Sequence, residues 1–308
     1  MKLTVVICTH NRSSLLMLAI ASLNQALFPH DCTISLLVIA NACSDDTIAR
    51  LKKLQLEQNI KNFPLSFYEE PIPGKSYALN RAIKMVNDGF ICFVDDDQRV
   101  DKNYFQSIQT AINTYPKISF FCGPLRPDWT GLEPNWIHTQ GKYKIYPEPI
   151  PHFELGYKSI KVNRTTRLPS GGTLIVKKEL FNQIGEFSTT LGPQGHNLVG
   201  GEDSDFILRT LDAGVAIQYI PDILQFHYVD INRLKLPYLI LGSFQRTRSF
   251  TLLNNPLPSS VPLYMWKKLF NYLFRTLFSF NMVKIRFYLM RIASTSGEMV
   301  GLLQKRTY

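Results

Sequence analysis

Short apolar segments alternate with helix-like segments along the first 120 residues. Nearly continuous apolar runs rich in Val and Ile occupy residues 3–9, 34–40 and 90–94. Such runs are typical of strands that are covered on both faces, as in a parallel sheet. Weaker strands are predicted at residues 65–68 and 118–122, and helices at residues 14–26, 46–57, 76–86 and 101–113. This alternation predicts an α/β fold with a doubly wound, mostly parallel, Rossmann-like sheet.

The alternation stops after residue 123. Residues 124–170 contain several prolines and two of the three tryptophans, Trp129 and Trp136, so we predict a long loop region there. Strands are predicted again at 173–176 and 215–220, with a helix at 202–212. From residue 236 onward the chain has a helical pattern, interrupted at 254–262. We therefore predict an α/β domain at residues 1–230 and a helical C-terminal region at residues 231–308.

The positive charge lies in the C-terminal region. The chain has a formal net charge of +10, yet residues 231–308 hold 12 Lys and Arg and a single acid, Glu298, while residues 1–230 carry a net charge of −1. This distribution argues against a nucleic-acid-binding protein and is compatible with a basic region that binds an anionic surface. Residues 261–308 are predicted to lie on an anionic membrane surface or, alternatively, to pack as a helical cap on the first domain.

Cysteine usage and hydropathy indicate the compartment. The five cysteines are scattered and show no C-x-x-C spacing, which argues for a reducing compartment and against a zinc site. The apolar run at the start is too short for a signal peptide, and no stretch approaches 18 uncharged apolar residues. We therefore expect a cytoplasmic protein, with peripheral attachment to the inner face of the membrane as a further possibility.

Polar clusters follow three of the predicted strands, at residues 9–12, 41–46 and 95–97. In open α/β sheets, ligands bind at the carboxyl ends of the strands, so these clusters predict one shared site. The last cluster is the triplet Asp95, Asp96 and Asp97. Mg²⁺ and Mn²⁺ bind carboxylates and phosphates together, and such a cation would offset the mutual repulsion of three carboxylates. A solvated acidic turn is the alternative interpretation.

Five motifs in order resemble those of a known enzyme family. They are Thr-Val-Val-Ile-Cys-Thr-His-Asn-Arg (4–12), Asn-Ala-Cys-Ser-Asp-Asp-Thr (41–47), Gly-Lys-Ser-Tyr-Ala-Leu-Asn (74–80), Phe-Val-Asp-Asp-Asp (93–97) and Gly-Gly-Glu-Asp-Ser-Asp-Phe (200–206). Together they resemble family 2 glycosyltransferases, which have the GT-A fold and invert the anomeric centre. The resemblance covers about residues 1–230.

The resemblance implies a nucleotide-sugar site and a divalent metal. By position, the residues implied to bind the nucleotide-sugar are Thr9, Asn11, Arg12, Gly74, Lys75, Asp95 and Asp96. Asp95 and Asp97 correspond to the ends of the D-x-D motif, with Asp97 the first candidate for the metal and Asp96 for the ribose. The chain departs from the family at Ala40, where an acidic residue usually contacts the base, and Asn41 is the candidate substitute.

The pair Glu202 and Asp203 resembles the catalytic pair on the acceptor side of the family. An inverting transfer needs a carboxylate to take the proton of the acceptor hydroxyl, and Asp203 is the candidate base. Alternatively, both acids only stabilise a helix N-terminus. His227 is a candidate metal ligand, which would favour Mn²⁺ over Mg²⁺, or a core residue. His196, in a Gly-rich loop, is a candidate for the acceptor entrance.

These observations predict an inverting, metal-dependent glycosyltransferase. It would move a sugar from a nucleoside-diphosphate sugar to a hydroxyl of a glycan or glycolipid, in the synthesis of a cell-surface polysaccharide or lipopolysaccharide-type product. Two alternatives stay open: a non-catalytic sugar- or lipid-binding module derived from a transferase, and a nucleotidyltransferase of sugar phosphates. Trp129 and Trp136 are candidates to stack on sugar rings, or else pack in the loop region.

Overall fold

The computed structural model describes residues 1–56, 63–146, 148–192, 201–255 and 257–304. The chain divides into two compact units. The sheet unit comprises residues 1–128 and 151–228, and the helical unit comprises residues 129–150 and 229–308. The helical unit therefore includes residues 129–150, which the sequence-based division placed in the first domain.

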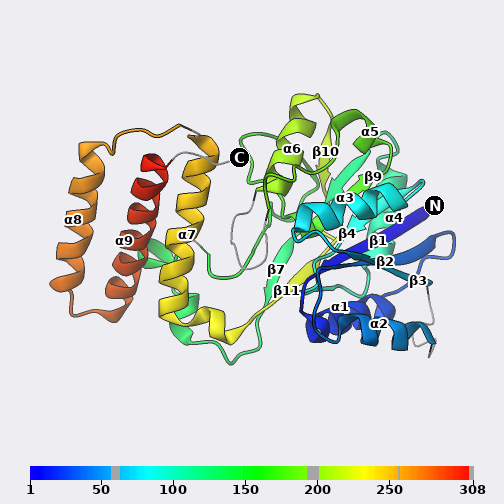
Figure 1. The fold of residues 1–308 in the computed structure, drawn as a ribbon, viewed down its shortest axis with the longest axis horizontal. Coiled ribbons are helices and arrows are strands. Elements are labelled where there is room, and N and C mark those ends of the chain that lie inside the picture. Colours follow the sequence, from blue (N-terminus) through cyan, green and yellow to red (C-terminus); the bar gives the residue numbers. More distant parts are fainter. Residues whose placement is uncertain (57–62, 147, 193–200, 256, 305–308) are drawn as a thin grey trace. The chain divides into compact units, whose positions relative to one another are not determined.

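An eight-stranded sheet forms the centre of the sheet unit, in the order β3-β2-β1-β4-β9-β6-β10-β8 (Figure 1). The strands are β1 (Lys2–Thr9), β2 (Thr33–Asn41), β3 (Leu65–Glu70), β4 (Phe90–Phe93), β6 (Phe120–Cys122), β8 (Ile160–Val162), β9 (Leu174–Lys177) and β10 (Ile217–Tyr219). Only β8 and β9 pair with their neighbours in antiparallel orientation. The mostly parallel α/β sheet predicted from the sequence is confirmed.

Helices cover both faces of this sheet. Three of them share a core with one face: α1 (Ser13–Gln25), α2 (Thr47–Leu56) and α4 (Tyr104–Thr114). The other face is covered by α3 (Lys75–Met85), α5 (Leu180–Ile184) and α6 (Glu202–Asp212). In β1, Val5 packs into the first core and Val6 into the second. Because successive side chains of a strand point to opposite faces, this double coverage explains the continuous apolar runs.

A second sheet in the same unit has three strands, in the order β5-β11-β7. Its strands are β5 (Gln98–Val100), β7 (Leu125–Asp128) and β11 (Gln225–Tyr228). The sequence analysis predicted none of them, and its loop region at 124–170 was wrong for β7 and β8. Each of these strands has only three or four residues, which is too few to show a period. This small sheet carries His227, the candidate metal ligand.

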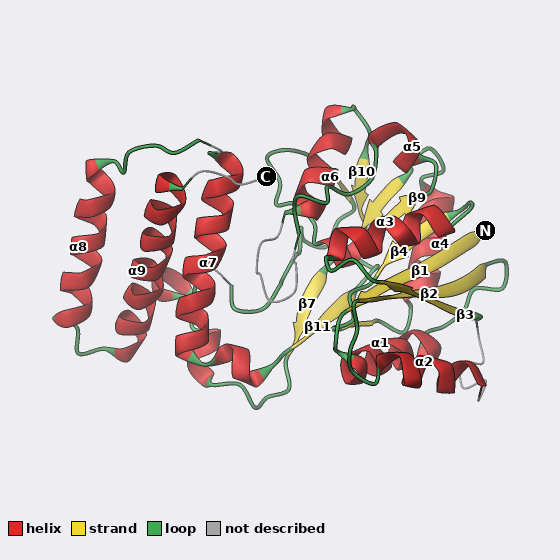
Figure 2. Cartoon of the chain, viewed as in Figure 1, coloured by secondary structure: helices red, strands yellow, loops and turns green. Residues whose placement is uncertain are grey.

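The helical unit contains three long helices, α7 (Leu236–Asn254), α8 (Leu263–Leu277) and α9 (Met282–Leu303) (Figure 2). The predicted break at 254–262 is confirmed. Helix α9 packs against both α7 and α8. A Cβ on Gly297 of α9 would lie 2.2 Å from the carbonyl oxygen of Phe244 in α7, so the missing side chain lets the two helices approach closely. Among the described helices, none is long and apolar enough to cross a membrane.

Candidate active site

The aspartate triplet follows β4 and is held by residues from the end of β1. The Oγ1 atom of Thr9 donates a hydrogen bond to Asp96 Oδ2 at 2.8 Å. One nitrogen of Arg12, Nη1, donates to Asp96 Oδ1 at 3.0 Å and to Asp97 Oδ2 at 2.9 Å. Burial and the neighbouring charge of Asp97 raise the pKa of Asp96 to about 6, although Arg12 opposes the shift. Arg12 thus offsets the repulsion within the triplet.

The loops after β1 and β2 have left-handed backbone positions that favour a polar or small residue. Asn11 has φ 53° and Ala42 has φ 46°. Asn is tolerated in this region, whereas Ala is strained there by about 1–2 kcal/mol. The Oδ1 atom of Asn11 accepts hydrogen bonds from the backbone N–H groups of Ser44 and Asp45, at 2.7 and 3.2 Å. Asn11 therefore joins the two loops, and strained positions of this kind concentrate at functional sites.

Asn41 holds the turn that leads into α3. Its Nδ2 atom donates to the carbonyl oxygens of Glu70 and Ile72, at 3.2 and 2.6 Å. Its Oδ1 atom accepts from the N–H of Gly74 at 2.8 Å. Asn41 is 5% exposed, so its amide serves this turn. Contact between Asn41 and a nucleotide base stays a prediction.

Lys75 connects the triplet with the start of α6. Gly74 has φ 140°, a conformation that other residues rarely adopt, and it places Lys75 at the first position of α3. The ammonium nitrogen of Lys75 lies 2.6 Å from Asp95 Oδ1 and 4.0 Å from Glu202 Oε1. Burial opposes ionisation of Asp95, but Lys75, with His227 and Arg12, holds the pKa of Asp95 below its ordinary value.

The small sheet brings His227 to the triplet. Strand β11 is antiparallel to β5, and His227 lies opposite Gln98, the residue that follows Asp97. The backbone N–H of Tyr228 donates to the carbonyl oxygen of Asp97 at 2.7 Å, which fixes this register. The Nε2 atom of His227 lies 3.5 Å from Asp97 Oδ1. The two side chains are 6% and 9% exposed.

The chemistry of this pair fits a divalent cation. The Nδ1 atom of His227 is 2.7 Å from the carbonyl oxygen of Tyr228. A carbonyl only accepts, so Nδ1 carries a proton, and Nε2, on the side of Asp97, is the nitrogen that would bind a cation. Within the described residues, no three His, Cys, Asp or Glu side chains are grouped to hold a metal. Two protein ligands suffice where substrate phosphates complete the coordination, as is usual for Mg²⁺.

The start of α6 places Glu202 and Asp203 across from the triplet. Gly201 has φ 115° and caps the helix. Asp203 Oδ2 accepts from the N–H of Gly171 at 2.8 Å, and its Oδ1 accepts from the N–H of Ser204 at 2.7 Å. These two backbone donors fix the orientation of the carboxylate. Asp203 is partly exposed, whereas Glu202 is buried.

Two adjacent glycines separate the triplet from α6. A Cβ on Gly171 would meet Asp203, with Oδ2 at 3.2 Å, and a Cβ on Gly172 would lie 2.5 Å from Asp95 Oδ2. The absence of these two side chains lets both carboxylates approach the same turn of backbone. One cavity is lined by residues from all of these segments, namely Val6, Cys8, Lys75, Leu79, Phe93, Val94, Asp95, Gly171, Phe187, Glu202 and Asp203.

Burial gives Glu202 an unusual protonation equilibrium. Burial, with the charge of Asp203, raises the pKa of Glu202 from 4.5 to about 7, against the opposing effect of Lys75. Between these two pH values the folded protein binds more protons than the unfolded chain. The free energy of unfolding therefore decreases as pH rises from about 4.5 to 7, by up to about 3 kcal/mol from this group.

We expect Glu202→Gln to remove this contribution. Urea unfolding of the ligand-free protein at several pH values should show that the variant gains stability relative to wild type as pH rises from about 4.5 to 7. Taking the difference between the two proteins cancels the contribution of Asp96, which titrates in the same range. The exposed residue Glu179 provides the control, since Glu179→Gln should run parallel to wild type. A constant difference for Glu202→Gln would contradict the raised pKa.

The sequence analysis missed three residues of this site: Gln98, Gly171 and Gly172. Gln98 is 3% exposed, and its Oε1 accepts from the N–H of Asp95 at 3.2 Å. Its position directly after the aspartate triplet could have indicated that Gln98 belongs to this site. Gly171 and Gly172 directly precede the strand predicted at residues 173–176, and the sequence analysis assigned them no functional role.

Three other candidates remain, two tryptophans of the helical unit and one histidine that the structure does not describe. Trp129 and Trp136 belong to the helical unit, where Trp129 contacts the ring of His138 and the guanidinium of Arg286 lies 4.7 Å from the ring centroid of Trp136. These contacts support packing, and stacking on sugars stays a prediction. His196 lies outside the described residues, as does Gly200.

Comparison with known proteins agrees with this geometry. The sequence profile of Glycosyl transferase family 2 matches residues 4–185, which is more than half of the chain. The chain belongs to this family. It is a glycosyltransferase of the GT-A fold, as the resemblance implied. No curated protein matches the chain significantly.

Solved glycosyltransferases share the fold at low sequence identity. The mannosyltransferase PcManGT from Pyrobaculum calidifontis, in complex with GDP-Man and Mn2+, is 17% identical, with a TM-score of 0.56 over 96% of this chain and 72% of that one. Residues 1–349 of S. aureus TarS, in complex with UDP-GlcNAc, are also 17% identical, with a TM-score of 0.56 over 98% and 90% of the two chains. The family membership, together with these neighbours, sets aside both alternatives, the binding module and the nucleotidyltransferase.

Proposed function

We propose that this glycosyltransferase is metal-dependent and inverts the anomeric centre of a nucleoside-diphosphate sugar. One observation carries the proposal: Asp95 of the triplet lines the same cavity as Glu202 and Asp203. Residues far apart in the sequence thus line one space, Asp95 from the end of β4 and Glu202 and Asp203 from the start of α6. An inverting transfer needs such convergence, because the departing diphosphate and the base lie on opposite sides of the reacting carbon.

The donor side would be formed by the loops after β1, β2 and β4. We assign nucleotide-sugar binding to Thr9, Asn11, Arg12, Asn41, Gly74, Lys75, Asp95 and Asp96. Lys75 and Arg12 supply the positive charge that a diphosphate needs. The neighbours' complexes with GDP-Man and UDP-GlcNAc support a nucleotide-sugar donor. Ala40 stands where an acid usually contacts the base, and Asn41, whose amide also holds the turn before α3, is the proposed substitute.

The metal would be held by Asp97 and His227, with Asp95 as a further candidate. When bound, a divalent cation offsets the negative charge that develops on the departing diphosphate. The imidazole of His227 favours Mn²⁺ over Mg²⁺, and the Mn2+ in the PcManGT complex supports this choice. In the structure Asp95 Oδ1 is paired with Lys75 and Asp97 Oδ2 with Arg12, but Asp97 Oδ1 faces Nε2 of His227 at 3.5 Å, which favours Asp97 and His227 as the pair.

Asp203 would act as the general base. As the acceptor oxygen forms its bond to the anomeric carbon, the bond from that carbon to the diphosphate breaks, and the hydroxyl proton passes to Asp203. Each oxygen of Asp203 accepts one backbone hydrogen bond, and a carboxylate oxygen keeps a second lone pair for the acceptor. Glu202 would act beside it by keeping Lys75 in place.

The acceptor would be a glycan or a glycolipid, in the synthesis of a cell-surface polysaccharide or lipopolysaccharide-type product. The free cysteines Cys8, Cys32, Cys43, Cys92 and Cys122 support a cytoplasmic location. There the enzyme would meet its acceptor at the inner face of the membrane, as a peripheral protein.

A screen of nucleotide sugars tests this function. We expect one or more members of a panel of GDP-, UDP- and dTDP-sugars to raise the melting temperature in the presence of Mn²⁺, and EDTA to abolish the shift. The stabilising donor should also release its nucleoside diphosphate slowly by hydrolysis. If no member of the panel stabilises the protein with Mn²⁺ or Mg²⁺, metal-dependent use of a nucleotide sugar is rejected.

A further inference from the structure

Helix α8 presents one face to α9. Met265 is fully buried, and the ring of Tyr272 lies 5.9 Å from that of Tyr288 in α9. Lys268 Nζ lies 3.9 Å from Glu298 Oε2. These three residues of α8 fall within one third of the helix circumference, so only this side of the helix is fixed by packing.

The exposed Leu, Phe and Trp residues of α8 lie on a different side. They are 39–79% exposed and are Leu263, Trp266, Phe270, Leu273, Phe274 and Leu277. At about 100° per residue they fall within an arc of about 100°, centred well away from Met265. Phe278 and Phe280, which follow the helix, extend the set with exposures of 66% and 104%. We call these eight residues the outer face of α8.

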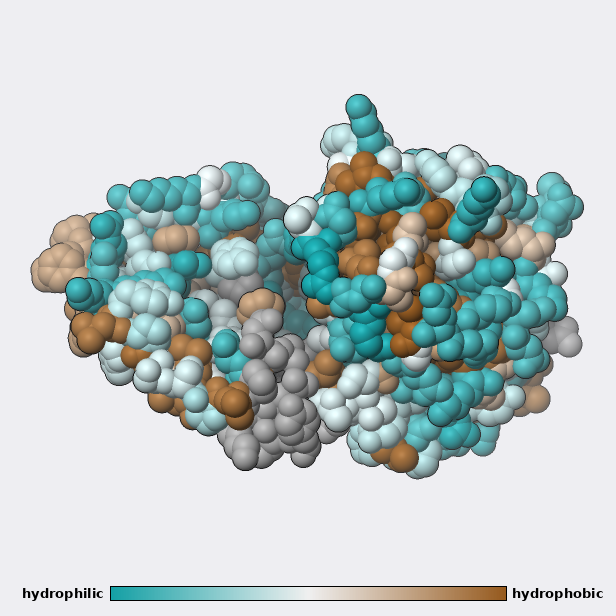
Figure 3. All heavy atoms as spheres, turned by 90° about the horizontal axis from the view of Figure 1, so that it is seen from above, coloured by the Kyte–Doolittle hydropathy of each residue, from teal (hydrophilic) through white to brown (hydrophobic). Residues whose placement is uncertain are grey.

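The outer face is a continuous apolar surface and needs a partner. Single exposed apolar residues are ordinary, but a contiguous patch of large side chains marks an interaction surface. In the view of Figure 3, brown and tan side chains gather at the left end of the molecule, where α8 lies. Large exposed apolar side chains thus follow one another along this helix and the loop after it.

Positive charge borders the outer face. Lys267 is exposed and lies beside the outer face, about 20° from Phe274 and about 60° from Phe270 around the helix. Arg275 lies about 100° from Phe274 and donates to Tyr288 Oη of α9 at 3.4 Å, so Lys267 is the cation at the edge of the outer face. The sequence of α8 contains no acidic residue, and Glu298, the single acid of residues 231–308, pairs with Lys268. A partner must therefore offer an apolar interior with negative charge at its edge.

A lipid bilayer with anionic headgroups has this combination of properties. The α8 face of a second copy does not, because it carries the same Lys267 and no acidic residue. Helix α8 has 15 residues, about 22 Å in length, which is shorter than the apolar thickness of a bilayer. Such a helix lies in the plane of the interface, with Trp and Phe below the headgroups and Lys and Arg among the phosphates.

We propose that the outer face of α8 docks the protein on an anionic lipid bilayer. The residues that insert are Trp266, Phe270, Phe274 and their apolar neighbours, and Lys267 binds the lipid phosphates. This inference deepens the peripheral attachment that the proposed function includes, but the docking itself does not depend on glycosyl transfer.

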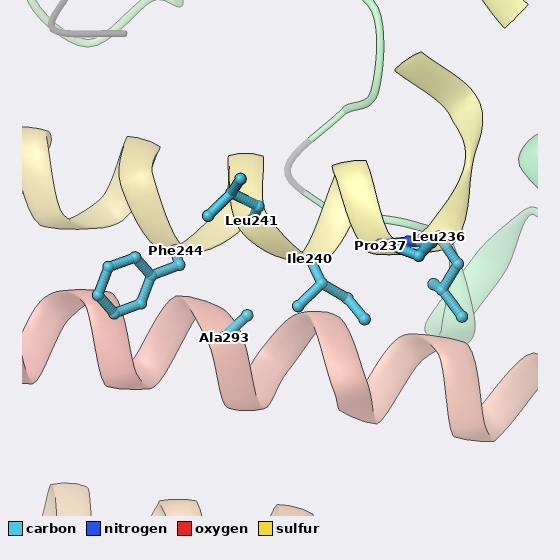
Figure 4. A pocket seen from close by; sticks show the side chains of 6 residues that line it. All are labelled: Leu236, Pro237, Ile240, Leu241, Phe244 and Ala293. Atoms are coloured by element: carbon cyan, nitrogen blue, oxygen red, sulfur yellow. The ribbon is translucent and has the colours of Figure 1, made fainter. Parts of the chain in front are cut away.

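A second apolar feature of the helical unit lacks this charge pattern. A hollow lies between α7 and α9, where Ile240 and Phe244 point toward α9 and Ala293 points back (Figure 4). Its lining has no charged residue: Leu236, Pro237, Ile240, Leu241, Phe244 and Ala293. Nothing in it selects an anionic surface, and the docking surface is therefore the outer face of α8 alone.

Vesicle co-sedimentation of the full chain tests the proposal. We expect the protein to pellet with vesicles that contain phosphatidylglycerol and to stay in the supernatant with pure phosphatidylcholine. Raising the salt concentration from about 0.1 to 1 M shortens the screening length from about 10 to 3 Å and should release most of the protein. Equal binding to both vesicles, or no binding to either, would overturn the proposal.

Matched variants assign the binding to the outer face. The double variant Phe270→Glu/Phe274→Glu should weaken binding at least about tenfold, since two apolar contacts are replaced by repelled charges. Lys267→Glu should weaken it by about fivefold or more. The controls are Leu56→Glu and Lys52→Glu, which change exposed residues of α2 in the same way and should bind as wild type does.

Two further measurements distinguish docking from misfolding and from self-association. The thermal shift with nucleotide sugar and Mn²⁺ should be the same in the α8 variants as in wild type, so loss of docking is distinguishable from loss of the site or the fold. The mass in solution without lipid should be that of one chain. A dimer that Phe270→Glu/Phe274→Glu converts to monomer would overturn the proposal and assign the outer face to contact between two copies of the chain.

Discussion

Asp203→Asn is expected to retain donor binding and to lose transfer. An amide cannot take the proton of the acceptor hydroxyl, and general-base assistance contributes about 10²–10⁴ to the rate, or roughly 3–5 kcal/mol of activation free energy. Single-turnover measurements with the stabilising donor should show a decrease of this size. The melting-temperature shift produced by donor and Mn²⁺ should stay close to that of wild type.

The structure offers a matched control in the same turn of helix. Asp205 also lies in the first turn of α6, where it pairs with Arg209 at 2.8 Å. Asp205→Asn removes the same charge from the helix N-terminus, but it leaves the Asp203 carboxylate and its hydrogen bonds to Gly171 and Ser204 intact. If both variants lose transfer equally, the role of Asp203 is electrostatic support of the helix, and the base must be sought elsewhere.

Asp97→Asn is expected to lose the metal dependence of donor binding. The carboxylate of Asp97 is 9% exposed and lies between Arg12 and His227. Replacing Asp97 by Asn removes the negatively charged member of the proposed ligand pair, Asp97 and His227. Residues that merely orient a metal ligand contribute about 10–100-fold to metal affinity, so the loss should be at least of this size. Calorimetric titration of Mn²⁺ into the protein with nucleoside diphosphate measures it directly.

The same titration needs a control for folding and for general charge effects. Asp88 is an exposed aspartate that pairs with Lys2 on the surface, and Asp88→Asn should bind Mn²⁺ as wild type does. Far-ultraviolet circular dichroism should show that Asp97→Asn is folded, since Arg12 keeps its bond to Asp96. Unchanged Mn²⁺ affinity in folded Asp97→Asn would refute the assignment of Asp97 as a metal ligand.

The sequence predicted the large sheet because burial on both faces leaves a strong signal. Residues 3–9 and 34–40 are apolar at almost every position, and the structure places them as β1 and β2 at the centre of the sheet. The polar clusters after the strands were also readable, because the carboxyl ends of parallel strands meet at one edge. The small sheet was not readable, and neither was the pairing of His227 with Gln98. That pairing depends on a register between segments more than 120 residues apart.

Several predicted ligand contacts turned out to include scaffold roles. Asn11 and Asn41 were chosen as nucleotide contacts by their places in motifs. In the structure their side chains also hold neighbouring loops, through hydrogen bonds to the backbone of Ser44 and Gly74. Sequence motifs mark such residues as important but do not distinguish a ligand contact from a loop contact, because the partner is a backbone group with no sequence signature.

The glycine pair after Ser170 couples the positions of two carboxylates of the candidate active site. Gly171 sets how near the carboxylate of Asp203, the proposed base, lies to this turn, and Gly172 does the same for the Lys75-bound carboxylate of Asp95. Any bulkier residue at either place would displace one carboxylate and, through a single peptide unit, disturb the other. Variation that adapts such an enzyme to new sugars should therefore spare this dipeptide and accumulate in the surrounding loops.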